Sequence, residues 1–338
     1  MGEKRVTVKD IAREAGVSPA LVSFVMSNEN AGKRTYRVNE DTAKHILSVA
    51  KRLNYCPNAS ARSLKSGKFN TIGVLFSDIS NAFFSEIARI IEDEAYKNHY
   101  YVLFGSTDED STKLEQLIRV FEDKGVVGLL VVPCAGADHC IKKVASRGVP
   151  VVLLDRNIEG DFPSVTLDNI TTSFELTNRL IEKGYRRIEM VSYTMNLSNI
   201  QGRENGYLKC MSNYGLSSYA NIHRLEHHAD FKKLDIIIED ARKRSVEAFV
   251  FATNTLAVQG MASIFKGGFH VPQDFGIACF DRNDAYEIYD TDLIYAKQPT
   301  TRFAQESISI LLDYMKTGGI ENRDRSVLLV PEIIDTGE

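Results

Sequence analysis

The sequence predicts a small N-terminal all-α head followed by an α/β core built on parallel sheets. Three observations support this fold class. The first 68 residues show helical patterning and carry 13 Lys and Arg against 6 Asp and Glu, whereas the remaining residues carry 28 against 39. From residue 70 onward, short apolar strands alternate with amphipathic helices. The length of 338 residues also exceeds what one compact core normally serves.

The head begins with the signals of two short helices separated by a tight turn. Thr7 and Asp10 have the spacing of a capping box, which satisfies free backbone N–H groups at a helix start. Gly16 ends this first helix, because glycine adopts a left-handed backbone conformation most easily. Ser18 and Pro19 predict the start of a second helix, as an N-cap followed by proline at the first helical position. This order is typical of a helix-turn-helix motif that binds DNA.

A third helix and a short fourth helix complete the expected head. Residues 39–53 place apolar side chains at helical spacing, and Pro57 ends that helix. Asn58 can cap a further helix over residues 59–64, which is too short to be stable by itself. We expect this helix to fold only when it docks on a partner and on DNA. Two other interpretations stay open: a generic three-helix bundle, and a plain linker.

The core shows the alternation of strands and helices that is typical of parallel sheets covered on both faces. Helices are expected at residues 84–98 and 112–124. No GxGxxG follows a strand and no GxxxxGK followed by Ser or Thr occurs, so nucleotide cofactor binding has no support. Ligands of such sheets bind at the C-terminal ends of the strands. The expected strands span residues 71–76, 101–104, 127–132, 150–154, 188–192, 248–251 and 276–280.

Several functional classes are disfavoured by what the sequence lacks. No run of about 18 apolar residues predicts a membrane span, and the N-terminus lacks the apolar segment of a secretory signal. The five cysteines are scattered, which favours reduced thiols in a cytoplasmic protein. His223 and His227 lie four residues apart, but no HExxH metal motif and no GxSxG nucleophile motif occurs. We therefore expect a cytoplasmic protein that is not an enzyme, binds no metal and needs no cofactor.

Particular runs of the head closely resemble the lactose/galactose repressor (LacI/GalR) family. These runs are residues 6–18 (VTVKDIAREAGVS), 22–23, 53–58 (LNYCPN) and 61–64 (ARSL). The resemblance continues through the core to residue 338. It implies a sequence-specific transcription regulator, a repressor, that binds double-stranded operator DNA as a homodimer. It also implies a two-lobed, periplasmic-binding-protein-like core that binds a small-molecule effector, a sugar or sugar derivative, between its lobes.

The resemblance further implies where the domains begin and end. Residues 1–57 would form the helix-turn-helix domain, and residues 58–69 the hinge helix and linker. The effector-binding core would cover residues 70–338. Its N-lobe would take residues 70–166 and 299–325, and its C-lobe residues 167–298 and 326–338.

The implied DNA-reading surface is the second helix of the head, which would lie in the major groove. Its reading positions hold Pro19, Ala20 and Phe24, which can contact thymine methyl groups but cannot form bidentate hydrogen bonds with a base. Leu64 of the hinge would wedge into a base step of the minor groove, so more of the specificity would depend on DNA shape. The residues implied to contact DNA are Thr7, Ser18, Pro19, Ala20, Ser23, Phe24, Asn30, Arg37, Tyr55, Asn58, Ala61, Leu64 and Lys65.

The implied effector site contains side chains that suit the hydroxyl groups of a sugar. Carboxylate and amide oxygens accept hydrogen bonds, a guanidinium donates them, and an aromatic ring stacks on an apolar sugar face. Arg282 adds a positive charge close by, which leads to the hypothesis of an acidic sugar. The alternative function is a cytoplasmic sugar-binding protein without DNA function. The residues implied to bind the effector are Asn81, Phe83, Asp155, Asn199, Arg203, Asn254, Asp281 and Gln298.

Overall fold

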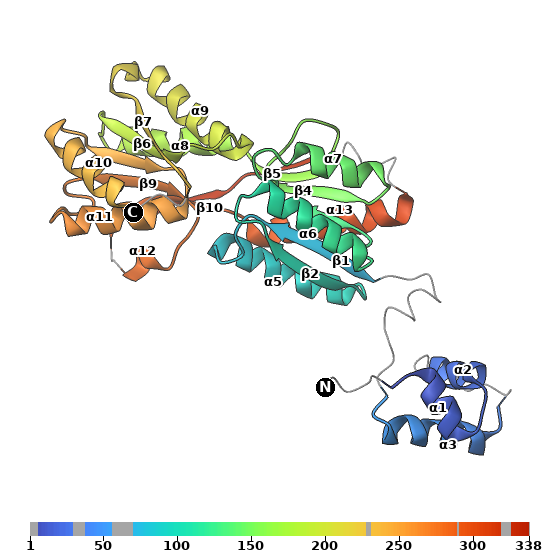
Figure 1. The fold of residues 1–338 in the computed structure, drawn as a ribbon. Helices are drawn as coiled ribbons and strands as arrows, with labels where there is room; N and C mark the ends of the chain where they lie inside the picture. The colour runs from blue at the N-terminus through green and yellow to red at the C-terminus, as the bar shows by residue number, and fades with distance from the viewer. Residues whose placement is uncertain are drawn as a thin grey trace. The chain divides into compact units, whose positions relative to one another are not determined.

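The chain forms two compact units, residues 1–68 and residues 69–338, in a computed structural model (Figure 1). Among the described residues, no helix is long and apolar enough to cross a lipid bilayer. The described residues are 6–29, 38–55, 70–227, 231–288, 291–318 and 326–337.

The first unit contains the helix-turn-helix that the sequence predicts. The Asp10 carboxylate accepts hydrogen bonds from the Thr7 backbone N–H at 2.9 Å and from the Thr7 hydroxyl at 2.7 Å. Gly16 has the left-handed φ of 67° that ends the first helix. The Ser18 hydroxyl accepts from the Leu21 N–H at 3.2 Å and so caps the second helix. The helices are α1 (Val8–Ala15), α2 (Pro19–Glu29) and α3 (Glu40–Arg52).

The three helices bury one small apolar core between them. An ion pair between Arg52 of α3 and Glu14 of α1, with an N–O distance of 2.8 Å, lies at the exposed edge of this core. The expected helix over residues 59–64 lies outside the described residues. The core side chains are Ile11, Ala12, Val22, Val25, Ile46, Val49 and Ala50.

The first lobe of the core is a six-stranded sheet in which all neighbouring strands are parallel. Helices α6 (Ser111–Asp123) and α7 (Asp138–Ser146) cover one face. Helices α5 (Ala82–Lys97) and α13 (Thr300–Thr317) cover the other. In spatial order the strands are β11 (Ser326–Leu329), β5 (Ser164–Leu167), β4 (Val151–Asp155), β3 (Leu129–Val131), β1 (Thr71–Phe76) and β2 (Tyr101–Ser106).

The second lobe is also a six-stranded sheet, in which only the edge strand β12 runs antiparallel to its neighbour. In spatial order the strands are β12 (Glu332–Asp335), β10 (Ile294–Lys297), β9 (Gly276–Phe280), β8 (Ala248–Phe251), β6 (Ile188–Tyr193) and β7 (Asn221–Leu225). The helices are α8 (Asn169–Glu182), α9 (Ser198–Asn213), η1 (Ser217–Tyr219), α10 (Lys232–Lys243), α11 (Asn254–Lys266) and α12 (Ala285–Ile288).

The chain passes between the two lobes three times (Figure 1). The first crossover follows β5 at residue 168, the second follows β10 at residues 298–299, and the third joins β11 to β12 at residues 330–331. The expected boundary that assigned residues 326–329 to the C-lobe is wrong, because β11 pairs with β5 in the first sheet. The sequence pattern does not predict this strand, because β11 lies at an edge of the sheet, where one apolar residue (Leu328) is exposed and the next (Leu329) is buried.

The seven expected strands all occur, but five short strands were not identified from the sequence. Continuous apolar runs such as residues 276–280 became buried central strands. The strands that were missed are short and contain mixed residues, and all five lie at or next to an edge of a sheet. Pairing with a neighbour, rather than local apolar pattern, defines such strands. They are β5, β7, β10, β11 and β12.

Candidate functional site

Two carboxylates stand at the C-terminal ends of strands from the two different sheets. Asp155 is the last residue of β4, and Asp281 directly follows β9. Both have left-handed backbone conformations, with φ values of 63° and 70°. A positive φ is uncommon for residues other than glycine, and such backbone strain concentrates at functional sites. The fold thus aims both carboxylates at the region where open α/β sheets bind ligands.

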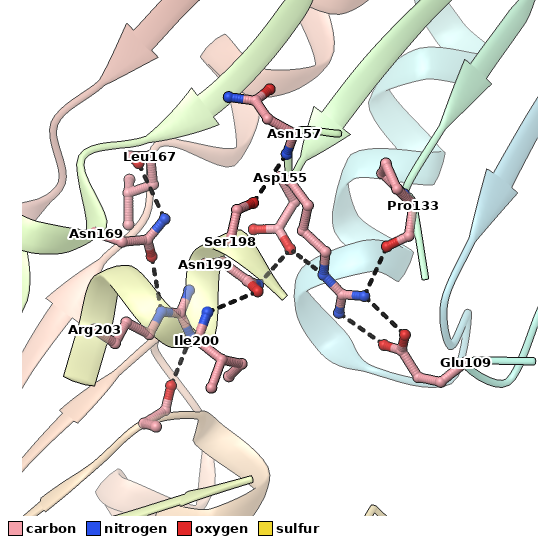
Figure 2. A network of polar contacts seen from close by, with 12 residues as sticks. Glu109, Pro133, Asp155, Asn157, Leu167, Asn169, Ser198, Asn199, Ile200 and Arg203 are labelled. Atoms are coloured by element: carbon pink, nitrogen blue, oxygen red, sulfur yellow. Dashed lines mark hydrogen bonds and ion pairs between the residues drawn. The ribbon is translucent and has the colours of Figure 1, made fainter. Parts of the chain in front are cut away.

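Asp155 lies at the centre of a buried polar network that joins the lobes (Figure 2). Its Oδ2 accepts a hydrogen bond from Nδ2 of Asn199, on helix α9 of the second lobe, at 2.9 Å. The same oxygen accepts from Nε of Arg156 at 3.3 Å. The Arg156 guanidinium also makes two hydrogen bonds to Glu109, at 2.8 and 2.7 Å, and one to the carbonyl oxygen of Pro133 at 3.0 Å. The first lobe therefore holds Asp155 in place, and the second lobe bonds to it.

The charges in this network depend on one another. Burial acts to lower the pKa of Arg156, but Glu109 and Asp155 outweigh burial, so its pKa is raised and it stays charged. Glu109 was not predicted from the sequence, because its partner Arg156 lies 47 residues away and no local motif indicates the contact. A buried ion pair of this kind is costly to break, because the remaining charge has no compensation.

Arg203 is fixed inside the second lobe by three contacts, and Figure 2 shows the two that are hydrogen bonds. Its Nε donates to Oδ1 of Asn169 at 2.8 Å, and its Nη1 donates to the carbonyl oxygen of Ala252 at 2.6 Å. The guanidinium carbon lies 3.9 Å from the centroid of the Phe280 ring, within the range of a cation–π contact. Burial lowers the pKa of Arg203, while the charge of Asp281 acts in the opposite direction. This side chain is therefore a pre-oriented cation beside two carboxylates.

A second polar contact joins the lobes through a pair of amides. Nδ2 of Asn254 donates to Oδ1 of Asn81 at 3.2 Å, and Nδ2 of Asn81 lies 3.4 Å from Oδ1 of Asn254. Asn81 also caps helix α5, because its Oδ1 accepts from the Phe83 N–H at 3.0 Å. A third contact runs from the Asn157 N–H to the hydroxyl of Ser198, at 3.0 Å. Side chains of both lobes thus satisfy one another directly.

Beside these contacts lies a cavity of about 290 Å³ that opens between helix α5, the loop after β9 and the second crossover. Gln298 of the crossover donates from Nε2 to the carboxylate of Asp281. Burial raises the pKa of Asp281, although Arg203 and Gln298 oppose this effect. The lining residues are Ala82, Phe83, Glu86, Asp281, Arg282, Asn283, Asp284, Lys297, Gln298 and Thr300.

The eight side chains expected at the effector site fall into three groups. Phe83, Asp281 and Gln298 line the cavity. The other two groups do not line it: four side chains bond across the lobes, and Arg203 is buried within the second lobe. Binding of an effector by these residues stays a prediction. The four bonding residues are Asn81, Asp155, Asn199 and Asn254.

The head presents part of the expected DNA-reading surface. Ser18, Pro19, Ala20 and Phe24 are exposed on or beside α2, and the Phe24 side chain is 37% exposed. Ser23 and Tyr55 are half-buried, and the exposed Thr7 uses its hydroxyl in the cap of α1. DNA contact by these residues stays a prediction. The remaining expected residues lie outside the described part of the chain: Asn30, Arg37, Asn58, Ala61, Leu64 and Lys65.

The histidine pair noted in the sequence has a different environment from a metal site. Nε2 of His223 lies 2.7 Å from Oε2 of Glu189, and the guanidinium of Arg244 binds the same carboxylate. Burial acts to raise the pKa of Glu189, but its hydrogen bonds with His223 and Arg244 outweigh burial and lower the pKa to about 2. Within the ranges that the structure covers, no three His, Cys, Asp or Glu side chains gather closely enough to hold a metal ion.

We predict that Arg156→Leu destabilises the core strongly. The substitution leaves Glu109 and Asp155 buried without their cation, which typically costs about 3–5 kcal/mol. Urea titration of the full chain measures the free energy of unfolding of the core. Arg147→Leu is the matched control, because Arg147 pairs with Glu122 at the surface and its loss should cost roughly 0–1 kcal/mol. Equal losses for the two variants would contradict the importance of the buried network.

Comparison with protein families places both units. A family described as "Bacterial regulatory proteins, lacI family" matches residues 7–58. A second, described as "Periplasmic binding proteins and sugar binding domain of LacI family", matches residues 69–300.

Similar proteins cover nearly the whole chain. The regulator RegA of Clostridium saccharobutylicum is 31% identical over 90% of this chain and 91% of its own length. Catabolite control protein A of Priestia megaterium is 30% identical over 98% of each chain. The ribose operon repressor of Bacillus subtilis is 30% identical over 92% of each chain.

Solved structures share the fold. The lac repressor dimer bound to operator and the anti-inducer ONPF has a TM-score of 0.78, with 20% identity over 98% of each chain. A transcriptional regulator CelR–cellobiose complex has a TM-score of 0.69, with 19% identity over 98% of each chain. The head and the core both match models that describe the LacI family. The chain belongs to the LacI family of bacterial regulatory proteins and is a DNA-binding transcription regulator.

Proposed function

We propose that this regulator is a homodimeric repressor whose affinity for operator DNA is controlled by a neutral sugar or sugar derivative bound between its lobes. The observation that carries the proposal is the set of polar side chains that meet between the lobes. Asp155 with Asn199, and Asn81 with Asn254, are hydrogen-bonded pairs with one member in each lobe. Sugar hydroxyl groups are donors and acceptors of the same strength, so a sugar can replace these partners.

The cavity composition supports a neutral effector over an acidic one. Arg282, which had suggested an acidic sugar, makes an ion pair with Asp284 at 3.2 Å. Three carboxylates line the same cavity, from Glu86, Asp281 and Asp284, and its second cation, Lys297, pairs with Glu332 at 3.8 Å. A uronate would therefore bring a further negative charge toward existing ones, which is unfavourable at short range. Carboxylates and amides that already bond to their neighbours suit the recognition of hydroxyl groups. We propose a binding role for these side chains and no enzymatic activity.

The head supports the DNA part of the proposal through its charge and its exposed helix. The first 68 residues carry a net charge of +7, and the exposed face of α2 includes Pro19, Ala20 and Phe24. Phosphate contacts would supply most of the affinity, and apolar contact to thymine methyl groups would supply part of the specificity. The remaining specificity would come from Leu64 as a wedge in the minor groove. Binding to chromosomal DNA would place the protein in the bacterial cytoplasm.

Coupling between the effector site and the DNA-binding head would follow from rotation of the lobes relative to each other. Replacing a partner across the lobes changes the relative angle that the lobes prefer, and three short crossovers transmit that angle to both ends of the core. Each linked equilibrium of this kind is typically worth about 1–3 kcal/mol. The alternative function, a sugar-binding protein without DNA function, leaves the basic charge and the exposed helix of the head without a role.

We predict that neutral sugars stabilise the full-length chain against heat and that sugar acids do not. A ligand that binds only the folded state raises the melting temperature by mass action. Thermal unfolding with D-ribose, D-glucose, D-galactose and cellobiose is compared with D-glucuronate and D-galacturonate. A shift with the two uronates alone would reverse the assignment of a neutral effector. No shift with any of the six would contradict a sugar effector.

We predict that Phe24→Ala lowers the affinity for operator DNA about tenfold, which is about 1.4 kcal/mol. The operator is the duplex that the wild-type chain selects from a random library, and binding is measured by fluorescence anisotropy. Because Phe24 is partly exposed, the melting temperature of the head should change little. Affinity for unrelated duplex DNA should also stay the same. Equal losses on operator and unrelated DNA would contradict a base-reading role for this side chain.

A further inference from the structure

Helix α8 begins directly after the first crossover between the lobes with a buried amide side chain, Asn169, that the sequence did not single out. We propose that Asn169 is a positioning residue that connects Arg203, in the region between the lobes where the effector would bind, to this crossover. The inference rests on the proposed function of the region between the lobes. The inference adds a residue through which the contact of a ligand with Arg203 would change the angle between the lobes.

Both ends of the Asn169 amide are engaged (Figure 2). Its Oδ1 accepts from Nε of Arg203 at 2.8 Å, and its Nδ2 donates to the carbonyl oxygen of Leu167 at 3.0 Å. Leu167 is the last residue of β5 in the first lobe, whereas Arg203 lies on α9 in the second lobe. One side chain therefore connects the arginine to the strand end from which the crossover departs.

Helix capping does not explain the Asn169 side chain. Asp168 already caps helix α8, because its Oδ1 accepts a hydrogen bond from the Thr171 N–H at 3.0 Å. The Asp168 N–H also donates to the carbonyl oxygen of Leu329, at 2.9 Å, which joins the first crossover to the third. The Asn169 amide points instead toward Arg203 and back to Leu167, so its bonds serve the link between the two lobes.

The close approach of α8 and α9 makes the contact with Arg203 possible. A Cβ atom on Gly202 would lie 2.9 Å from Cβ of Asn169, a separation that real Cβ atoms essentially never show. A Cβ atom on Gly206 would overlap the carbonyl oxygen of Ile170. Larger residues at these two positions would push α9 away from α8 and separate Arg203 from Asn169. The sequence thus keeps the helices close where the amide meets the guanidinium.

The second crossover repeats the arrangement with the other charged side chain of the region. Gln298 is buried, directly follows β10, and donates to the Asp281 carboxylate. Arg203 and Asp281 are therefore each bonded to an amide that lies on a crossover or directly after one. A ligand that displaced Arg203 would pull on Asn169, and through it on the end of β5. This gives a short physical route from the effector region to the lobe angle.

Two substitutions separate the two bonds of Asn169. Asn169→Asp keeps an acceptor for Arg203 and loses the donor to Leu167, whereas Asn169→Ala loses both. Each full-length variant is titrated with D-ribose, D-glucose, D-galactose and cellobiose, and its operator affinity is measured with and without each sugar. Asn178→Asp and Asn178→Ala are matched controls on the same helix, where Asn178 bonds to Glu182 and Tyr214.

We expect Asn169→Asp to bind sugar within about threefold of the wild type while the effect of sugar on operator affinity falls at least fivefold, since coupling factors are typically about 5–150. Asn169→Ala should weaken sugar binding roughly tenfold, because it also removes a charge-assisted hydrogen bond. The controls should behave as the wild type. Unchanged coupling in Asn169→Asp, or an equal loss in the controls, would overturn the inference.

A measurement without sugar tests the bond to Arg203 directly. In nuclear magnetic resonance spectra of the full-length chain, the Nε–H of Arg203 should exchange slowly with water in the wild type and in Asn169→Asp. Its signal should be lost in Asn169→Ala, and its persistence there would contradict the bond. If the wild type binds none of the four sugars while this signal is present, the proposed function fails although the contact exists.

Discussion

The need of buried polar groups for partners is the constraint on which the two-lobed core depends. A buried amide or carboxylate without a hydrogen bond costs free energy, and several of these groups take a partner from the other lobe as well as from their own. Asp155 stands at the end of a first-lobe strand with its bonding partner Asn199 on the second lobe. Asn81 and Asn254 repeat the pattern. The lobes are thus held together by bonds that another polar molecule can also make.

Other features of the core bear on the proposal that a ligand replaces the hydrogen bonds between the lobes. Arg156, which Glu109 holds in place, bonds to Asp155 within the first lobe and so fixes the carboxylate that the second lobe contacts. Three short crossovers connect the two lobes. In the proposed mechanism the bonds lost and gained would be similar in kind, so two arrangements of the lobes would differ little in free energy. A small ligand can then shift the balance between them.

Local signals in the sequence predicted the parts of the fold that local physics determines. The cap at Thr7, the turn at Gly16 and the apolar central strands were all found where the sequence placed them. Partnerships between distant residues could not be found this way. Glu109 binds Arg156 across 47 positions, and Asn169 binds Arg203 across 34. Each of these contacts exists only once the elements of its own lobe have packed together, so no short pattern in the sequence marks it.

The distance between the lobes tests the central claim most directly. Spin labels on Gln116→Cys of α6 and Glu239→Cys of α10, with Cys56→Ser, report that distance by pulsed electron paramagnetic resonance; the four cysteines that the structure describes are buried. The chain is compared with a variant that also carries Asn199→Ala and Asn254→Ala. If the bonds across the lobes set their angle, the variant shows a shifted and broader distance distribution. Superimposable distributions would contradict the account.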